Sequence, residues 1–364
     1  MGVVFVMHQN QPLDEWTARM RGGEIPQNLI VSLAAQVDGS IITRVGVQAR
    51  LTDRVLALIT RLPSVCWAQA RMVRRSASVD DSFFVIDPPT GLLVALLCPQ
   101  NRVAVQIIDP TSGPTRAMLR LLGWLRRAPD GFTATPEFLD PMRRMARRGR
   151  LRSAAVLDLH VDERYFAPAQ SPRKPRLIAT AGAERRDYAT LAEAIEGLDV
   201  TVVACAVSPD AGPKSARYPS RVPPNLSFAD LSMPELRDLY REASLVVIPM
   251  LRNPLGAGGT VAGEARACGT PLIVSHTSYL SGLAEQGLAV GVAPGDPAEL
   301  RRAIVAMLDD APGRAELAQR SHRALLDINA TSAVLATWHR YLRATFGLAD
   351  VGATRPRVEV SGTG

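Results

Sequence analysis

The chain has 364 residues, of which 47% are hydrophobic and 21% are charged, so it is long and apolar enough to bury two hydrophobic cores. This composition excludes a largely disordered chain. The four cysteines are far apart and show neither the spacing of a zinc site nor that of a disulfide framework. The N-terminal sequence MGVVFVMHQNQ has no basic region before its apolar residues, and no apolar run reaches the length of a membrane span. We therefore expect a cytoplasmic protein of two domains.

The net charge of +7 arises in one segment. From Arg116 to Arg152 the chain has ten arginines and no lysine against three acidic residues, so this segment accounts for the whole excess. Arg116, Arg120 and Arg127 would share one side of a helix, and residues 141–148 would form a second basic helix. A basic face of this kind fits an anionic membrane surface, or it is simply solvated. Nucleic acid is not expected, because no nucleic-acid-binding motif appears.

Short apolar runs rich in β-branched residues alternate with segments of helical period along most of the chain. This alternation predicts an α/β fold with parallel sheets flanked by helices. In the first half we expect strands at residues 3–7, 40–45, 64–68, 82–86, 103–108 and 131–134, and helices at 26–37 and 50–61. In the second half we expect strands at residues 176–181, 200–206, 245–250 and 272–275. Capping residues predict helix starts at Asp187, Ser232 and Asp296.

A proline-rich and basic stretch, residues 167–175, interrupts this alternation. Such a composition is typical of a linker. We therefore assign residues 1–168 to an N-terminal domain and residues 169–330 to a C-terminal domain.

The chain is expected to end in a helix and a tail. Residues 331–346 have an apolar stripe that includes Trp338 and Tyr341, and this stripe needs a surface to cover it. We expect the helix to pack back on the N-terminal domain. Residues 347–364 are rich in Gly, Thr, Ser and Val and show no periodic pattern, which predicts a flexible tail.

The most informative segment is LVVIPMLRNPLGAGGTVAGEARACGTPLIVS, residues 245–275, which reads as strand, glycine-rich loop, short helix and strand. Gly256, Gly258 and Gly259 leave backbone amides free to face a ligand, and Thr260 can cap the helix that follows. A loop of this kind at a helix N-terminus is a ready site for a diphosphate.

Glu264 follows in the first turn of that helix. Near the sugar of a bound nucleotide, its carboxylate could accept hydrogen bonds from both ribose hydroxyls. The alternative is that the glycines form a tight turn and that Glu264 only complements the helix dipole, an effect of ~0.3–1 kcal/mol. The order of the neighbouring motifs favours the first interpretation.

The motifs of the second half occur in the order found in glycosyltransferase family 4, which the chain resembles from Ala155 to Leu308. The family's domain junction is matched by AVLDLHVDERYFAP, and its first C-terminal strand and helix by ATAGAERRDYATLAEAI. The strand, helix and strand before the donor loop are matched by NLSFADLSMPELRDLYREASLVVIPM. The elements after that loop are matched by GEARACGTPLIVS and VAPGDPAELRRAI. The resemblance implies the GT-B architecture, in which two Rossmann-like domains have parallel sheets facing a central cleft.

The resemblance also implies site residues. Arg186, with Arg185 as an alternative, occupies the place of a basic ligand of the diphosphate, where a guanidinium suits the charge that builds on the leaving group. A solvent-exposed arginine is the other interpretation of this position. Gly22 and Gly23 resemble the family's Gly-Gly loop after the first strand, which lies in the cleft of relatives, although an ordinary turn fits them equally.

Two positions depart from the family's pattern. Many members have a first glutamate eight residues before the ribose-binding one, where this chain has Gly256. A His-Asp element commonly follows the fourth or fifth N-terminal strand, but here Ile108 leads into Asp109 with no histidine. His8, at the end of the first expected strand, would face the cleft instead or would have a structural role.

The resemblance implies a glycosyltransferase that moves a sugar from a nucleotide-diphosphate sugar, held by the C-terminal domain, to an acceptor held by the N-terminal domain. It implies retention at the anomeric carbon and neither a metal nor another cofactor, because helix-terminal amides and an arginine stabilise the leaving diphosphate. A lipid-linked acceptor would suit contact of the segment from Arg116 to Arg152 with the inner face of the membrane. The two departures keep open a non-catalytic nucleotide-sugar-binding protein and a sugar-nucleotide epimerase.

Overall fold

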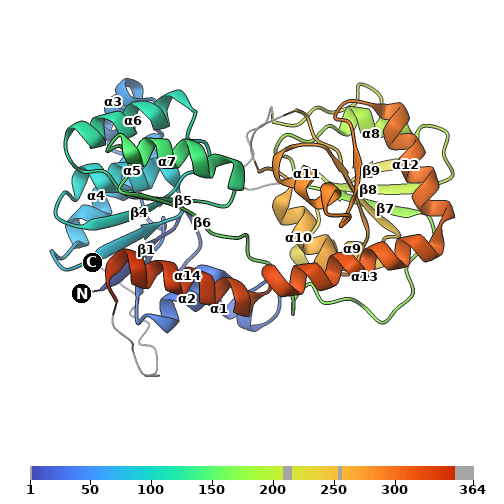
Figure 1. Cartoon of the computed structure of the whole chain (residues 1–364), viewed down its shortest axis with the longest axis horizontal. Coiled ribbons are helices and arrows are strands. Elements are labelled where there is room, and N and C mark those ends of the chain that lie inside the picture. Colours follow the sequence, from blue (N-terminus) through green and yellow to red (C-terminus); the bar gives the residue numbers. More distant parts are fainter. Residues whose placement is uncertain (1, 208–214, 253–255, 349–364) are drawn as a thin grey trace. The chain divides into compact units, whose positions relative to one another are not determined.

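The computed structural model describes residues 2–207, 215–252 and 256–348, so the tail expected beyond residue 348 lies outside the described residues. The chain forms two compact units (Figure 1). The first unit contains the chain up to Gly22, Gln27–Leu157 and the chain from Leu335 onward, and the second contains Gly23–Pro26 and Asp158–Val334. The chain therefore enters the second unit after Leu157, and the proline-rich stretch at residues 167–175 lies inside that unit.

Each unit is built on a six-stranded sheet in which all the paired strands are parallel. The first sheet has the order β2-β1-β3-β4-β5-β6, with β1 Val3–Val6, β2 Ser40–Ile42, β3 Ser82–Val85, β4 Arg102–Gln106, β5 Asp130–Thr133 and β6 Ser153–Val156. The second has the order β12-β11-β10-β7-β8-β9, with β7 Leu177–Ala181, β8 Thr201–Cys205, β9 Leu226–Phe228, β10 Leu245–Ile248, β11 Leu272–Ser275 and β12 Val290–Val292. The predicted α/β class with two Rossmann-like sheets is confirmed.

One expected strand is wrong. Residues 64–68 begin helix α4, Ser64–Ser76, because Cys66, Ala70 and Val73 recur at helical spacing and are all buried. The periodicity prediction missed the short strands β6, β9 and β12, which lie at sheet edges and are buried only in part. Strands of this kind leave little alternating hydrophobic signal in the sequence.

Aromatic rings on β1, β3 and β5 contact one another in the first unit. Phe84 stacks on Phe132 with ring centroids 4.6 Å apart, and Phe5 lies 5.6 Å from Phe84. The last helix, α14, Thr331–Phe346, places Trp338 5.7 Å from Phe84 and 5.9 Å from Phe132. The other helices of this unit are α1 Leu13–Arg21, α2 Leu29–Gln36, α3 Leu51–Thr60, α5 Pro88–Leu97, α6 Gly113–Trp124 and α7 Leu139–Arg147.

The helices of the second unit begin where capping residues predicted them. The Asp187 side chain accepts a hydrogen bond from the Thr190 amide, and Ser232 forms a capping box with Glu235. The Asp296 side chain accepts a hydrogen bond from the Glu299 amide. These residues precede α8 Tyr188–Ile195, α9 Met233–Glu242 and α12 Pro297–Asp309. The remaining helices are α10 Gly259–Ala267, α11 Ser278–Glu285 and α13 Ala311–Ile328.

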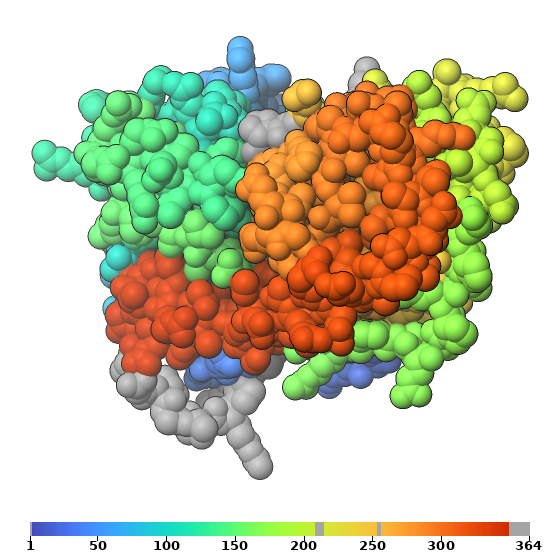
Figure 2. Space-filling view, turned by 45° about the vertical axis from the view of Figure 1, so that its right-hand side comes forward, coloured from blue at the N-terminus to red at the C-terminus, as the bar shows by residue number. Residues whose placement is uncertain are grey.

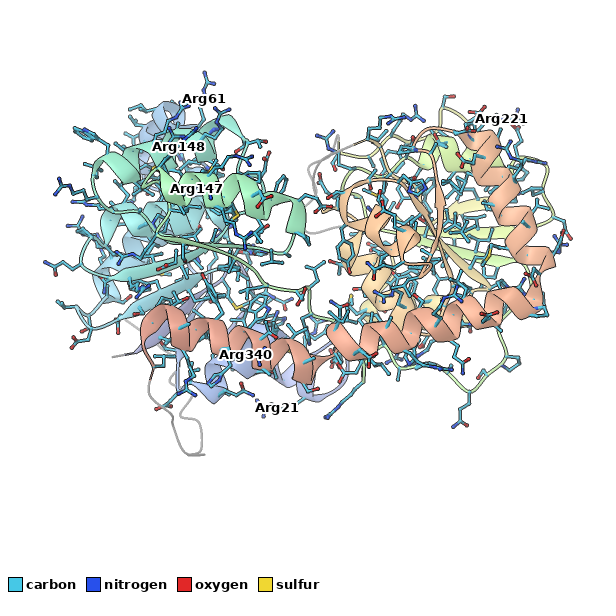
Figure 3. The ribbon with its side chains drawn as sticks, viewed as in Figure 1. Arg21, Arg61, Arg147, Arg148, Arg221 and Arg340 are labelled. Carbon is cyan, nitrogen blue, oxygen red and sulfur yellow. The ribbon has the colours of Figure 1, made fainter. Side chains whose placement is uncertain are left out.

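The basic segment from Arg116 to Arg152 includes most of α6 and all of α7. Arg147, the last residue of α7, and its neighbour Arg148 are labelled in Figure 3. Arg127 does not lie free beside Arg116 and Arg120, because its Nη1 donates to the Leu96 carbonyl at 2.8 Å. The apolar side of α6 is also only partly covered, since Trp124 is 80% exposed. No helix in the described part of the chain is long and apolar enough to cross a membrane.

Arg173, in the middle of the proline-rich stretch, ties together the C-terminal ends of two helices. Its guanidinium donates to the carbonyls of the residues that end α9 and α10 and to the Thr270 hydroxyl; these acceptors are Tyr240, Arg241, Ala243, Cys268, Gly269 and Thr270, at 2.7–3.1 Å. The last carbonyls of a helix have no partner within the helix, and a cation there also complements the helix dipole.

Replacing Arg173 by methionine should lower the free energy of unfolding by on the order of 3 kcal/mol or more, because several carbonyls lose a charged donor at once. Urea denaturation measures this change. Lys174→Met is the matched control, since the ion pair of Lys174 with Glu242 is exposed and should contribute less than about 1 kcal/mol. Equal effects of the two substitutions would contradict the role given to Arg173.

Candidate functional site

The loops after β7 and β10 meet at the carboxyl edge of the second sheet. The Asp187 amide donates to the Pro249 carbonyl, and the Leu251 amide donates to the Arg185 carbonyl, both at 2.9 Å. The carboxyl edge of a parallel sheet is where ligands bind in open α/β folds. The residues expected to bind a ligand in this unit lie in or near these two loops.

Helix α10 begins at Gly259, and its N-cap is Gly258, whose φ of 95° is in the left-handed region that favours glycine. The expected cap at Thr260 is therefore wrong: the left-handed turn starts the helix earlier, and Thr260 is an exposed residue of its first turn. Gly256, the first described residue after residues 253–255, accepts through its carbonyl a 3.4 Å hydrogen bond from the Gly259 amide. Residues 253–255 lie outside the described residues.

Two glycines of α10 allow a crossing segment to touch the helix directly. A Cβ atom at Gly259 would lie 2.6 Å from Cδ1 of Leu159, and one at Gly263 would overlap Cγ2 of Val161. A side chain at position 259 would force the Leu159 side chain to move, so Gly259 has a role in packing whatever ligand the loop binds. Its neighbour Gly258 is the residue whose backbone starts the helix.

Glu264 was expected in the first turn of α10, but it lies in the second turn because the helix begins at Gly259. Its side chain is partly buried, and its Oε2 accepts a 3.1 Å hydrogen bond from the Tyr240 hydroxyl of α9. Burial raises the pKa of Glu264 from 4.5 to about 7, while the Tyr240 hydrogen bond and the charge of Arg186 act in the opposite direction. The carboxyl group therefore changes charge close to neutral pH.

Arg186 lies in the interior, with 2% of its surface exposed. Its Nε donates to the Ala181 carbonyl at 2.7 Å, and its Nη1 donates to the Glu184 carbonyl at 2.9 Å. Burial lowers the pKa of Arg186, and the nearby Glu264 is among the groups that raise it. The guanidinium is bonded to carbonyl oxygens rather than to carboxylates, so these partners do not neutralise its charge.

Arg185, the alternative to Arg186, is an exposed residue with a φ of 54°. Its amide donates to Oγ of Ser215 at 3.0 Å. The two arginines thus differ in kind, since Arg186 is fixed inside the unit whereas the side chain of Arg185 is open to solvent.

The site residues expected in the first half follow strands of the first sheet or the first helix. His8 is partly buried just after β1, and Asp109 follows β4, where its carboxylate accepts hydrogen bonds from the amide and hydroxyl of Thr111. Gly22 and Gly23 do not directly follow the first strand, because helix α1 lies between them and β1. The structure brings Arg186 and Glu264 together in the second unit, whereas His8 and Asp109 are residues of the first unit.

Sequence reasoning missed Tyr240 as a partner of Glu264. The spacing of Leu236, Leu239 and Tyr240 correctly predicted a buried helix face, and all three are buried. The spacing of apolar residues predicts which helix face is buried, but it does not predict which acceptor the Tyr240 hydroxyl bonds. Among the described residues, no group of three or more His, Cys, Asp or Glu side chains is arranged to hold a metal ion.

The pKa of Glu264 predicts a pH dependence of stability. Because the folded-state pKa is raised, folding favours the protonated carboxyl, and this stabilisation is complete below about pH 4.5 and lost as the pH rises through about 7. Glu264→Gln should therefore gain stability relative to the parent between pH 5 and pH 8, by up to about 3 kcal/mol.

Urea denaturation at both pH values measures this difference. Glu193→Gln, which removes an exposed carboxylate of α8, serves as the control. A parent protein and a Glu264→Gln variant with parallel pH profiles would show that Glu264 titrates at its ordinary pKa.

Comparison with known proteins finds similar sequences for part of the chain. Residues 178–310 match the family model described as Glycosyl transferases group 1. D-inositol 3-phosphate glycosyltransferase of Salinispora arenicola is 31% identical over 190 residues, which are 48% of this chain and 41% of that protein. The chain thus matches less than half the length of this curated relative.

Solved structures show the same fold across nearly the whole chain. Sucrose-phosphate synthase from Thermosynechococcus elongatus has a TM-score of 0.68 at 15% identity, covering 95% of this chain and 99% of that one. Anabaena HepE in complex with UDP-glucose has a TM-score of 0.63 at 13% identity, covering 94% of this chain and 100% of that one. The fold is that of GT-B proteins, and the match of residues 178–310 to the Glycosyl transferases group 1 model confirms the family resemblance seen in the sequence.

Proposed function

We propose that this protein is a glycosyltransferase that uses a nucleotide-diphosphate sugar and binds this donor at the start of α10. The observation that carries the proposal is the buried guanidinium of Arg186, at the sheet edge where α10 begins. This guanidinium donates its hydrogen bonds to neutral backbone carbonyls. The charge of Glu264 offsets the cost of burying this cation only in part, and an arriving diphosphate would supply further negative charge. The bound UDP-glucose of Anabaena HepE, which shares the fold, supports a donor of this class.

Within this proposal, Glu264 binds the ribose of the donor and the backbone amides at the start of α10 bind the diphosphate. The glycine start leaves the first turn without a side-chain cap, so its amides after that of Gly259, which donates to the Gly256 carbonyl, are available to an anion. A carboxylate can accept hydrogen bonds from both ribose hydroxyls, and the Tyr240 bond holds this carboxylate in place.

The proposed reaction transfers the sugar with retention of configuration at the anomeric carbon, and it uses no metal ion. The leaving diphosphate gains negative charge as the glycosidic bond breaks, and Arg186 together with the helix amides stabilises that charge. The first unit would hold the acceptor, with a lipid-linked acceptor as one option.

An assay of mass balance tests the activity. A transferase releases nucleoside diphosphate only when an acceptor is present, an epimerase changes the donor without an acceptor, and a non-catalytic binding protein does neither. Calorimetry with common nucleotide sugars identifies the donor beforehand.

Glu264→Ala should weaken donor binding roughly ten- to hundredfold, because the donor loses a charged hydrogen-bond partner worth about 1.5–3 kcal/mol. Calorimetry at pH 8, where the carboxylate is charged, measures the affinity. Glu264→Gln should be milder, since it keeps one acceptor oxygen and the shape of the side chain. If folded Glu264→Ala bound the donor as tightly as the parent, the donor site would lie elsewhere; Glu193→Ala controls for the loss of a carboxylate.

Arg186→Ala should depress turnover by roughly a hundredfold while changing donor affinity less, because the diphosphate gains charge only as the bond breaks. Steady-state kinetics and calorimetry separate the two quantities. Arg185→Ala is the matched substitution of the exposed neighbour and should leave turnover nearly unchanged. A loss of turnover in Arg185→Ala alone would transfer the role to Arg185.

A further inference from the structure

Helix α3 of the first unit exposes its apolar residues. Leu51, Val55, Leu58 and Ile59 recur at i, i+4, i+7 and i+8, the spacing of a helix face that normally packs on a core. Their exposed fractions are 77%, 48%, 82% and 73%. Figures 1 and 2 show the blue segment of α3 at an outer edge of the first unit. The apolar stripe of this helix therefore faces away from the hydrophobic core.

The opposite face of α3 is attached to α4 by polar contacts. Asp53 is 2% exposed, forms an ion pair with Arg71 of α4, and accepts a 2.7 Å hydrogen bond from the Arg50 amide. Thr60 accepts a 3.1 Å hydrogen bond from the indole nitrogen of Trp67. These contacts fix the orientation of the helix, so the exposure of its apolar stripe does not result from a loose attachment.

The charge around the stripe is strongly positive. From Arg44 to Arg75 the sequence has seven arginines and no lysine against a single acidic residue, the buried Asp53. At 3.6 residues per turn, Arg50, Arg54 and Arg61 fall together on one flank of the stripe. Figure 3 shows Arg61 at the outer edge of the first unit.

A cavity lies next to the start of the helix. Its volume is about 530 Å³, and Arg50, Arg71 and Arg75 line it together with residues 46–49, 68 and 72. Three guanidinium groups around one cavity favour an anion of the size of a phosphate-bearing headgroup. Arg71 already pairs with Asp53, whereas Arg75 is exposed.

We propose that α3 docks the first unit on a bilayer of anionic lipid. The stripe enters the region between headgroups and acyl chains, the flanking arginines meet lipid phosphates, and the cavity takes one headgroup. An exposed apolar stripe with basic residues on its flank is the pattern of a helix that lies in a membrane interface. The apolar stripe and the charge complementarity together distinguish this surface from a merely solvated basic face.

Cosedimentation with vesicles tests the proposal, and it requires no nucleotide sugar, so its outcome is independent of the proposed enzyme activity. The parent should bind vesicles containing phosphatidylglycerol and should bind pure phosphatidylcholine vesicles much more weakly. The double variant Leu58→Ser, Ile59→Ser should lose at least tenfold in affinity. Its substituted side chains are exposed in the parent, so the variant should remain folded by circular dichroism.

Two further variants separate the contributions. Arg54→Gln with Arg61→Gln should lower the affinity for anionic vesicles roughly tenfold and reduce its dependence on salt. Ile328→Ser, at an exposed position of α13 in the second unit, is the matched control and should bind as the parent does.

Three results would overturn the proposal. The first is a parent protein that does not prefer anionic vesicles. The second is binding that depends on Arg116 and Arg120 of α6 but not on Leu58 and Ile59. The third is a self-association, seen by sedimentation velocity, that the double variant abolishes, because the stripe would then bind a second copy of the chain.

Discussion

The second unit depends on the direct contact between α10 and the segment that crosses it. Leu159 and Val161 lie where side chains at positions 259 and 263 would otherwise stand, so the two glycines let this segment approach the helix closely. The crossing segment is fixed in turn by Asn329, whose Nδ2 donates to the Leu159 carbonyl at 2.9 Å. This contact sets the position of α10, and with it the position of the backbone amides and the carboxyl group that the helix carries.

The candidate site balances groups that are unfavourable when buried alone. Burial disfavours the charge of both Arg186 and Glu264, and each lowers this cost for the other. Tyr240 adds a neutral donor that stabilises the carboxylate without adding charge. The result is a site whose net charge changes with small shifts in pH near neutrality, which is a common property of functional sites and rarer in structural ion pairs.

The sequence predicted the site's backbone frame better than its contacts. The short helix after the glycines occurs where the spacing placed it, because such patterns depend on local backbone geometry. Its start did not follow the prediction, since the left-handed Gly258 begins the helix at Gly259 and Glu264 therefore lies beyond the first turn. The burial of Arg186 could not be predicted, since it depends on carbonyls that only the folded loop brings within reach. The helix at residues 50–61 was expected, yet periodicity alone does not tell which side of a stripe meets the core. That is why the exposure of Leu58 became visible only in the structure.

The return of the chain to the first unit has a consequence for biosynthesis. The second unit ends at Val334, and the first unit includes the chain from Leu335 onward. A ribosome therefore delivers the whole of the second unit before it delivers the helical segment that brings Trp338 onto Phe84 and Phe132. During translation the second unit can therefore fold first, while the aromatic cluster of the first unit is not yet covered by Trp338. This order is the reverse of the usual one, in which the N-terminal domain folds first.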